Sequence, residues 1–164
     1  MVAGFLFIFW WSSVVSRCET GRERRRTTEK KTMSLKTVDA TVSEFEEVFE
    51  RFQSENSQNQ LKFLLFLANK DPSTSLTWCP DCNVAEPVIY QKLEASQNDV
   101  ALLRGYVGDK PTWRNPSHPW RVDPRFKLTG IPTLIRWENE AIIGRLEDYE
   151  AHVGNKIDAL LASN

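Results

Sequence analysis

The sequence has few cysteines and almost no net charge, and each of these shortages argues against one class of protein. It holds three cysteines in 164 residues, too few for a domain held together by disulfides. Its formal net charge of −1 does not suggest a nucleic-acid binder. Apolar residues make up 41% of the chain and include six Trp, three Tyr and nine Phe, enough for a substantial hydrophobic core.

The sequence also lacks an apolar run of the length that a transmembrane helix needs. The apolar stretch from Val2 to Val15 is shorter than the roughly 20 residues that a transmembrane helix needs. It has the length of a signal-peptide core, but no Lys or Arg precedes it. Residues 17–31 are basic and rich in Thr, which predicts disorder. Residues 1–32 carry seven Lys/Arg against three Asp/Glu, whereas the rest of the chain carries fourteen against nineteen.

Three interpretations of residues 1–32 remain open. They are upstream sequence read in frame, with Met33 as the start; or a cleaved signal or short anchor; or an unassigned extension. Each interpretation leaves residues 33–164 as the single folded domain. A start at Met33 predicts a cytosolic protein, whereas a genuine signal in residues 1–16 predicts the secretory pathway.

Hydrophobic spacing predicts the first half of this domain. Residues 41–54 form an amphipathic helix with a capping box of Ser43 and Glu46, preceded by an edge strand around Val38. Residues 61–68 are nearly all apolar, which is typical of a strand buried on both faces of a parallel sheet. The apolar side of the first helix is formed by Phe45, Val48, Phe49 and Phe52.

The second half continues the alternation of helices and strands. A helix is predicted over 81–97 and a strand over 100–107, followed by a long loop over 108–124 in which Trp113 and Trp120 pack. Strands over 133–137 and 141–146 form a hairpin, and a final helix uses Tyr149, Val153, Ile157 and Leu161. Helix 81–97 contains Pro87, which should kink it, and places Val84, Val88, Ile89 and Leu93 on one side. The fold class is therefore α/β, a mixed central sheet with helices on both faces.

The motif Trp78-Cys79-Pro80-Asp81-Cys82 carries the chemistry. Two cysteines three residues apart can close a small, reversible disulfide ring. Because so small a ring removes little entropy from the unfolded chain, the pair is better explained as a redox pair than as a stabilising disulfide. A cysteine attacks a disulfide as the thiolate, and the N–H groups at a helix N-terminus stabilise that anion. We expect Cys79, just before the helix, to be the nucleophile and Cys82, one turn inside, to be the resolving cysteine.

The neighbours of the two cysteines are expected to tune their reactivity. Pro80 lacks an N–H and fixes φ, which suits the first helical turn. The Asp81 carboxylate opposes a thiolate beside it, so the pKa of Cys79 should fall less than it would with a neutral residue there. Zinc binding is disfavoured because the body adds only two distant histidines, His118 and His152, and no second pair of cysteines. We expect both histidines to have packing or surface roles.

These residues resemble the thioredoxins. The two cysteines are followed at the family's spacing by Pro87, and Gly130-Ile131-Pro132-Thr133 resembles the family's Gly-Ile-Pro-Thr turn. The segment Trp78 to Cys82 is most similar to the Clot group, typified by thioredoxin domain-containing protein 17, whose motif is Trp-Cys-Pro-Asp-Cys. The resemblance also includes Ala85-Glu86-Pro87 and covers about residues 33–164.

The resemblance implies a thioredoxin-like fold and a monomeric disulfide reductase with no bound cofactor or metal. It implies that the Ile131–Pro132 bond is cis and that the backbone of Ile131 pairs with a substrate chain. It implies that the Cys79–Cys82 disulfide is regenerated with electrons from NADPH through thioredoxin reductase or a similar reductant. Substrates would be small molecules or proteins with disulfides; no nucleic acid is implied, nor a membrane for the folded domain.

The chain departs from ordinary thioredoxins at two places. The strand before the dithiol lacks the buried acid used for proton transfer, and Leu65 stands at that position. Asp81 or Glu86 are the candidate substitutes, although a helix position such as Glu86 is more often solvated. The longer segment 108–127 is rich in basic residues, which suggests a restricted set of small, accessible or anionic disulfides.

Two other functions remain open at this point. The chain could be a non-enzymatic interaction protein that retains the fold, although its intact pair of cysteines argues against that. It could be a disulfide oxidase or isomerase of the secretory pathway if residues 1–16 are a signal, although Asp81 argues against that.

Overall fold

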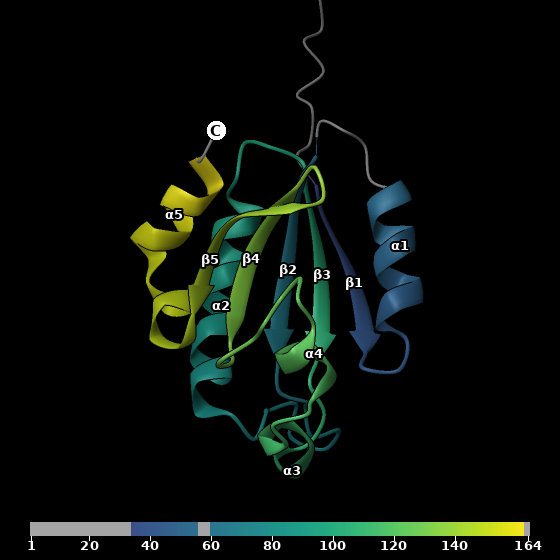
Figure 1. Ribbon diagram of the computed structural model, residues 1–164. Helices are drawn as coiled ribbons and strands as arrows, with labels where there is room; N and C mark the ends of the chain where they lie inside the picture. The colour runs from purple at the N-terminus through teal and green to yellow at the C-terminus, as the bar shows by residue number, and fades with distance from the viewer. Residues whose placement is uncertain (1–33, 56–59, 163–164) are drawn as a thin grey trace, which may run out of the picture. The chain divides into compact units, whose positions relative to one another are not determined.

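The computed structural model describes residues 34–55 and 60–162, which form a five-stranded mixed sheet flanked by helices (Figure 1). The prediction for residues 1–32 lies outside the described residues. No helix in the described ranges is long and apolar enough to span a membrane. In chain order the elements are β1 Leu35–Thr41, α1 Phe45–Glu55, β2 Leu61–Leu67, α2 Pro80–Glu94, β3 Val100–Tyr106, α3 Lys110–Arg114, α4 Pro119–Val122, β4 Thr133–Glu138, β5 Ala141–Glu147, the 3-10 helix η1 Asp148–His152 and α5 Gly154–Ala162.

The strands lie in the order β1-β3-β2-β4-β5, and the predicted α/β class is confirmed. β1, β3 and β2 run parallel, whereas β4 pairs antiparallel with β2 and β5 with β4. β1 is the predicted edge strand. β2 lies at the centre, and the side chains from Phe63 to Leu67 are fully buried, as predicted for a strand covered on both faces.

Helix α1 covers one face of the sheet, and α2 with α5 covers the other (Figure 1). Side chains of β2 alternate between the two faces, as the pleat of a strand requires. Phe66 meets Phe45 of α1, with ring centroids 5.7 Å apart. Arg136, which lies opposite Phe63 in the register, instead donates to the carbonyl oxygens of Leu160 and Leu161 in α5.

The apolar positions predicted for α1 are confirmed, but its predicted N-terminus is wrong. The helix begins at Phe45, and the carboxylate of Glu46 accepts hydrogen bonds from Arg125 instead of the backbone near Ser43. The ion pair with Arg125 takes the side chain away from the capping geometry. The buried residues are Phe45, Val48, Phe49 and Phe52.

The predicted apolar side of α2 is wrong at Val84, which is 54% exposed. The buried side instead starts from Cys82 and continues through Ala85, Ile89 and Leu93. Successive residues of a helix are about 100° apart, so a residue two positions after Cys82 points away from the sheet.

The segment 108–127 contributes to the core, as predicted for Trp113 and Trp120. The segment contains two short helices, α3 and α4, which the prediction of a loop did not include. Trp120 is 2% exposed, with ring centroids 4.8 Å from Phe45 and 4.9 Å from Phe66. A Cβ on Gly105 would lie 3.1 Å from the Trp120 ring, so glycine in β3 makes room for it.

The final helix differs from the prediction because η1 and α5 replace one continuous helix. Tyr149 is 67% exposed, whereas Ile157 and Leu160 are buried. Tyr149 lies in η1 and Ile157 in α5, so their spacing along the chain does not put them on one helix face.

Candidate redox site

Cys79 lies at the start of α2, beyond the end of the central strand β2. It is the N-cap of the helix, and its Sγ accepts a hydrogen bond from the backbone N–H of Cys82 at 3.3 Å. Pro80 occupies the first turn, where its missing N–H costs no helical hydrogen bond. Both cysteines are free thiols; Cys79 is 6% exposed and Cys82 is fully buried.

The two thiols are electrostatically different. The Cys82 side chain donates a hydrogen bond to Cys79, which outweighs burial and the Asp81 charge and lowers the pKa of Cys79 to about 7. The same hydrogen bond, together with burial, raises the pKa of Cys82. The negative charge of Asp81 opposes ionisation of Cys79, as predicted. At pH 7 about half of Cys79 is therefore thiolate, whereas Cys82 stays a buried thiol.

Alkylation of Cys79 is expected to follow its thiolate fraction, with a midpoint at about pH 7. Below the midpoint the rate with iodoacetamide should fall about tenfold per pH unit, because the thiol form does not react. Asp81→Asn should move the midpoint to lower pH, since it removes a charge that raises the pKa of Cys79. A midpoint near the value of about 8.5 for free cysteine would contradict this prediction.

The Gly130–Thr133 turn lies against the dithiol. The Ile131–Pro132 peptide bond is cis, as the resemblance implied. The Cys79 thiol donates to the carbonyl oxygen of Ile131, with Sγ and O 3.6 Å apart. The Thr133 hydroxyl donates to the Gly130 carbonyl oxygen at 2.9 Å and closes the turn. The structure thus brings Ile131 and Pro132 together with the two cysteines, about 50 residues away in the chain.

The Trp78 side chain is held by a hydrogen bond to the backbone just after β3. Its indole Nε1 donates to the carbonyl oxygen of Gly108 at 3.0 Å, and the Gly108 N–H donates to the Asn69 side chain at 2.7 Å. Gly108 has φ +90°, a backbone conformation that favours glycine. The end of β3 therefore holds the tryptophan that precedes the dithiol.

Thr77 and Asn83 are two site residues that the sequence reasoning missed. The Thr77 hydroxyl donates to the Cys79 carbonyl oxygen at 2.8 Å. The Asn83 side chain accepts from the Thr77 N–H at 2.8 Å and donates to the Thr77 carbonyl oxygen at 3.0 Å. These contacts clamp the chain on both sides of Cys79. In the sequence, Thr77 and Asn83 stand out only as polar residues on either side of the motif.

Glu86 is a buried acid, so the expectation that it is solvated is wrong. Its carboxylate accepts hydrogen bonds from Lys70 and from the hydroxyl of Tyr90, each at 2.7 Å. Arg104 donates to the same hydroxyl at 2.6 Å and lies opposite Leu65 in the register. The buried acid on this face is thus supplied by α2, whereas β2 presents leucine.

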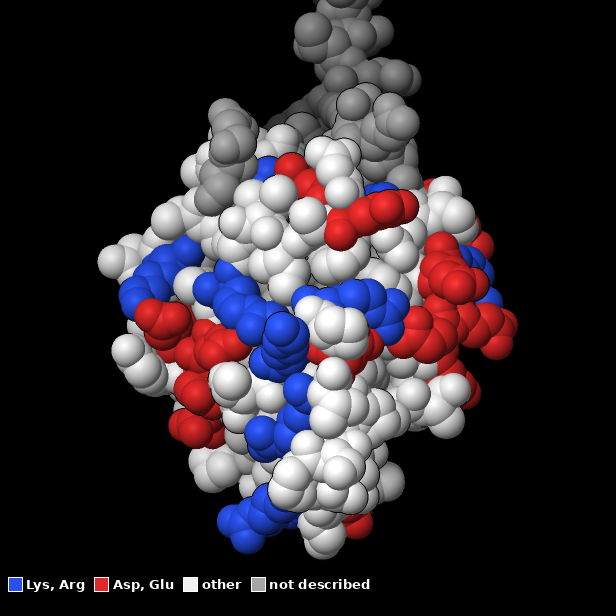
Figure 2. All heavy atoms as spheres, viewed as in Figure 1, with Lys and Arg blue, Asp and Glu red and all other residues white. Residues whose placement is uncertain are grey.

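Two of the five basic residues of segment 108–127, Arg121 and Arg125, contact other side chains of the protein. Arg125 pairs with Asp123 and with Glu46. The Arg121 guanidinium lies 3.9 Å from the centroid of the Trp113 ring. Figure 2 shows basic side chains gathered in the middle of one face, with acidic ones at its flanks. Formal charge in this segment therefore overstates its free positive charge.

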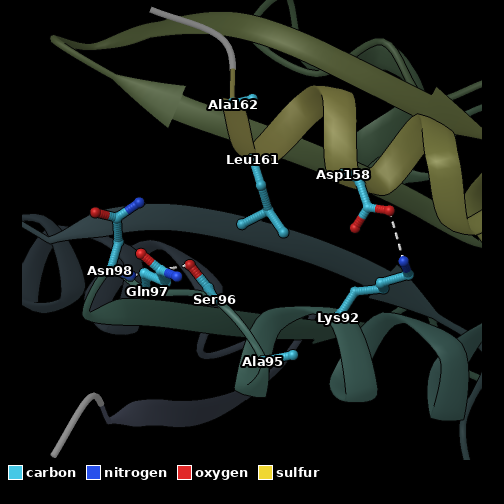
Figure 3. Close-up of a pocket in the computed structure, with 8 residues that line it drawn as sticks. All are labelled: Lys92, Ala95, Ser96, Gln97, Asn98, Asp158, Leu161 and Ala162. Atoms are coloured by element: carbon cyan, nitrogen blue, oxygen red, sulfur yellow. Dashed lines mark hydrogen bonds and ion pairs between the residues drawn. The ribbon is translucent and has the colours of Figure 1, made fainter.

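Other candidate sites in the described part of the chain are weaker. In those residues, no three His, Cys, Asp or Glu side chains are placed to hold a metal ion. A shallow hollow of about 300 Å³ lies between the end of α2 and α5 (Figure 3). The ion pair of Lys92 with Asp158 crosses it at 2.5 Å, and Leu161 supplies an apolar wall. The hollow lies at the opposite end of α2 from Cys79.

Comparison with known proteins agrees with this geometry. The family model "Thioredoxin domain-containing protein 17-like, thioredoxin domain" matches residues 41–163. The thioredoxin-like protein Clot of Oryza sativa is 56% identical over 79% of this chain and 97% of that protein. Mouse thioredoxin domain-containing protein 17 is 36% identical over 58% of this chain and 80% of that protein. Thioredoxin f from spinach chloroplast has a similar fold, with a TM-score of 0.51 at 13% identity over 78% of this chain and 86% of that chain.

Proposed function

This chain belongs to the thioredoxin domain-containing protein 17-like family, and from that premise we propose that it is a disulfide reductase. The observation that supports the proposal is the asymmetry of its dithiol. Cys79 has a pKa of about 7 at the mouth of the site, and the pKa of the buried Cys82 is raised. An attacking thiol is most effective when its pKa is near the ambient pH.

In the proposed reaction the Cys79 thiolate attacks one sulfur of a substrate disulfide. A mixed disulfide forms between Cys79 and that sulfur, and the other sulfur leaves as a thiolate that takes up a proton. Cys82 then loses its proton and attacks Sγ of Cys79, which releases the second substrate thiol. The substrate gains two electrons and two protons, and the protein is left with the Cys79–Cys82 disulfide.

The neighbouring residues have separate roles in this proposal. Trp78, Pro80 and Asp81 tune the nucleophile, and the backbone of Ile131 beside Pro132 docks the substrate chain. The helix N-terminus stabilises the thiolate through the Cys82 N–H. The substrate range is a restricted set of small or accessible disulfides, because α3 and α4 build up the surface next to Trp78.

The cycle needs a reductant that returns two electrons to the Cys79–Cys82 disulfide. We assign this role to thioredoxin reductase with NADPH or to a similar reductant, and we place the reaction in the cytosol. A reducing compartment suits a dithiol that must be reduced again after each turnover.

The proposal is tested by multiple-turnover reduction with NADPH and thioredoxin reductase as the electron source. We expect hydroxyethyl disulfide to be reduced with many turnovers per protein molecule, followed as loss of NADPH absorbance. Insulin should be reduced more slowly than by an ordinary thioredoxin at equal concentration. Dithiothreitol replaces the reductase in a parallel assay, which separates failure of the recycling partner from failure of the dithiol. Absence of turnover in both assays would contradict the proposed function.

A further inference from the structure

Two carboxylates, one in the dithiol motif and one on the turn that lies against it, form no ion pair among the described residues. Asp81 is exposed in the first turn of α2, and its charge acts on both Cys79 and Cys82. Asp148 is exposed directly after β5. Among the hydrogen bonds and ion pairs of the described residues, neither carboxylate contacts a basic side chain. The two side chains are also close enough for Asp81 to contribute to the raised pKa of Asp148, after burial and Glu147.

Asp148 is held in place by the turn that lies against Cys79. Its backbone N–H donates to the carbonyl oxygen of Pro132 at 2.8 Å, and its φ is +48°. Its carboxylate folds over Gly130, where a Cβ would stand 2.2 Å from Oδ1. Aspartate tolerates this left-handed backbone better than most residues with a side chain. Asp148 therefore adds negative charge to the turn that contains Ile131.

The basic groups nearest to this turn contact other partners than Asp148. The Glu147 carboxylate is already paired with Arg145 at 3.0 Å. Arg121 donates to the carbonyl oxygen of Thr129 at 3.2 Å, and its guanidinium carbon lies 3.9 Å from the centroid of the Trp113 ring. Asp81 and Asp148 thus place two carboxylates at the dithiol and at the turn that lies against it.

We propose that Asp81 and Asp148 determine substrate charge, so that this protein reduces cationic disulfides in preference to anionic ones. The inference rests on the proposed reductase function and names the substrate class of the same site. It replaces the expectation of anionic disulfides that the composition of segment 108–127 suggested. The physical basis is Coulomb attraction between two unpaired carboxylates and a positive group beside the disulfide, which is weakened by salt.

The test uses three disulfides of similar size: cystamine, hydroxyethyl disulfide and dithiodipropionate, which carry two positive charges, no charge and two negative charges. Dithiothreitol is the electron source, and the background reaction without protein is subtracted. The measured quantity is the ratio of kcat/KM for cystamine to that for dithiodipropionate. A change in the thiolate fraction of Cys79 affects both substrates equally and cancels in this ratio.

Asp81→Asn and Asp148→Asn are each expected to lower the ratio about threefold, and the double variant about tenfold. Asparagine keeps the size of the side chain and tolerates the positive φ of residue 148. The matched control is Glu94→Gln, which removes one negative charge from the same helix. Position 94 is thirteen residues from Asp81, or about 20 Å along the helix, beyond the Debye length of about 8 Å at physiological salt. Its ratio should equal that of the wild type.

Salt gives an independent readout. Raising the NaCl concentration should lower the ratio for the wild type towards that of the double variant, whose ratio should hardly change. If all three disulfides are turned over but the substitutions leave the ratio unchanged, the charge inference is wrong and the reductase function stands. If none of the three is turned over, the proposed function itself fails.

Discussion

The Cys79→Ser variant is expected to lose turnover of every disulfide substrate, by on the order of 1,000-fold or more. Serine keeps the N-cap role because its hydroxyl can also accept the Cys82 N–H. Its oxygen is not ionised near neutral pH, whereas the thiol of Cys79 has a pKa of about 7. The variant should therefore fold normally and fail only in the chemical step. Its activity is measured with hydroxyethyl disulfide and its fold by circular dichroism.

The Cys82→Ser variant provides the complementary result. It retains the nucleophile but cannot resolve the mixed disulfide, so Cys79 should remain joined to half of the substrate. Intact-protein mass spectrometry should detect that addition, and dithiothreitol should remove it. Loss of the Cys82 thiol also removes a hydrogen bond that lowers the pKa of Cys79, so trapping should be faster at higher pH. Sustained turnover by Cys79→Ser would rule out the proposed mechanism.

The largest effect on stability is expected from Trp120→Ala, about 3–5 kcal/mol in the free energy of unfolding. Trp120 is 2% exposed and contacts Phe45 of α1, Phe66 of β2 and the ring of His118. Alanine would leave a cavity where helix α4 meets the central sheet. The free energy is measured by urea unfolding at a pH where both proteins unfold reversibly.

Val122→Ala is the matched control for this prediction. Val122 lies in the same short helix as Trp120 but is 63% exposed. Its loss should change the free energy of unfolding by no more than about 0.5 kcal/mol. A small effect of Trp120→Ala would mean that segment 108–127 can detach from the core at little cost. In that case it would not be a fixed wall beside the dithiol.

Local patterns in the sequence were sufficient for the main elements of the fold. The nearly unbroken apolar run of β2 predicted a strand buried on both faces, and the spacing of Phe45 and Phe52 predicted the buried side of α1. These signals are reliable because burial on one or two faces imposes a period on the chain itself. The prediction of a capping box at Ser43 was wrong because the Glu46 side chain forms an ion pair with Arg125, 79 residues away.

The sequence by itself determined the dithiol, the helix that begins at it and the resemblance that identified Pro132. Those features depend on residues close together in the chain. Only the tertiary structure decided that Glu86 is buried, that Arg125 is paired and that Asp148 stands beside the turn at Cys79. Charge acts through space, and its strength depends on distance and burial. The number of basic residues near a motif could not show that the fold adds the carboxylate of Asp148 to the turn that lies against Cys79.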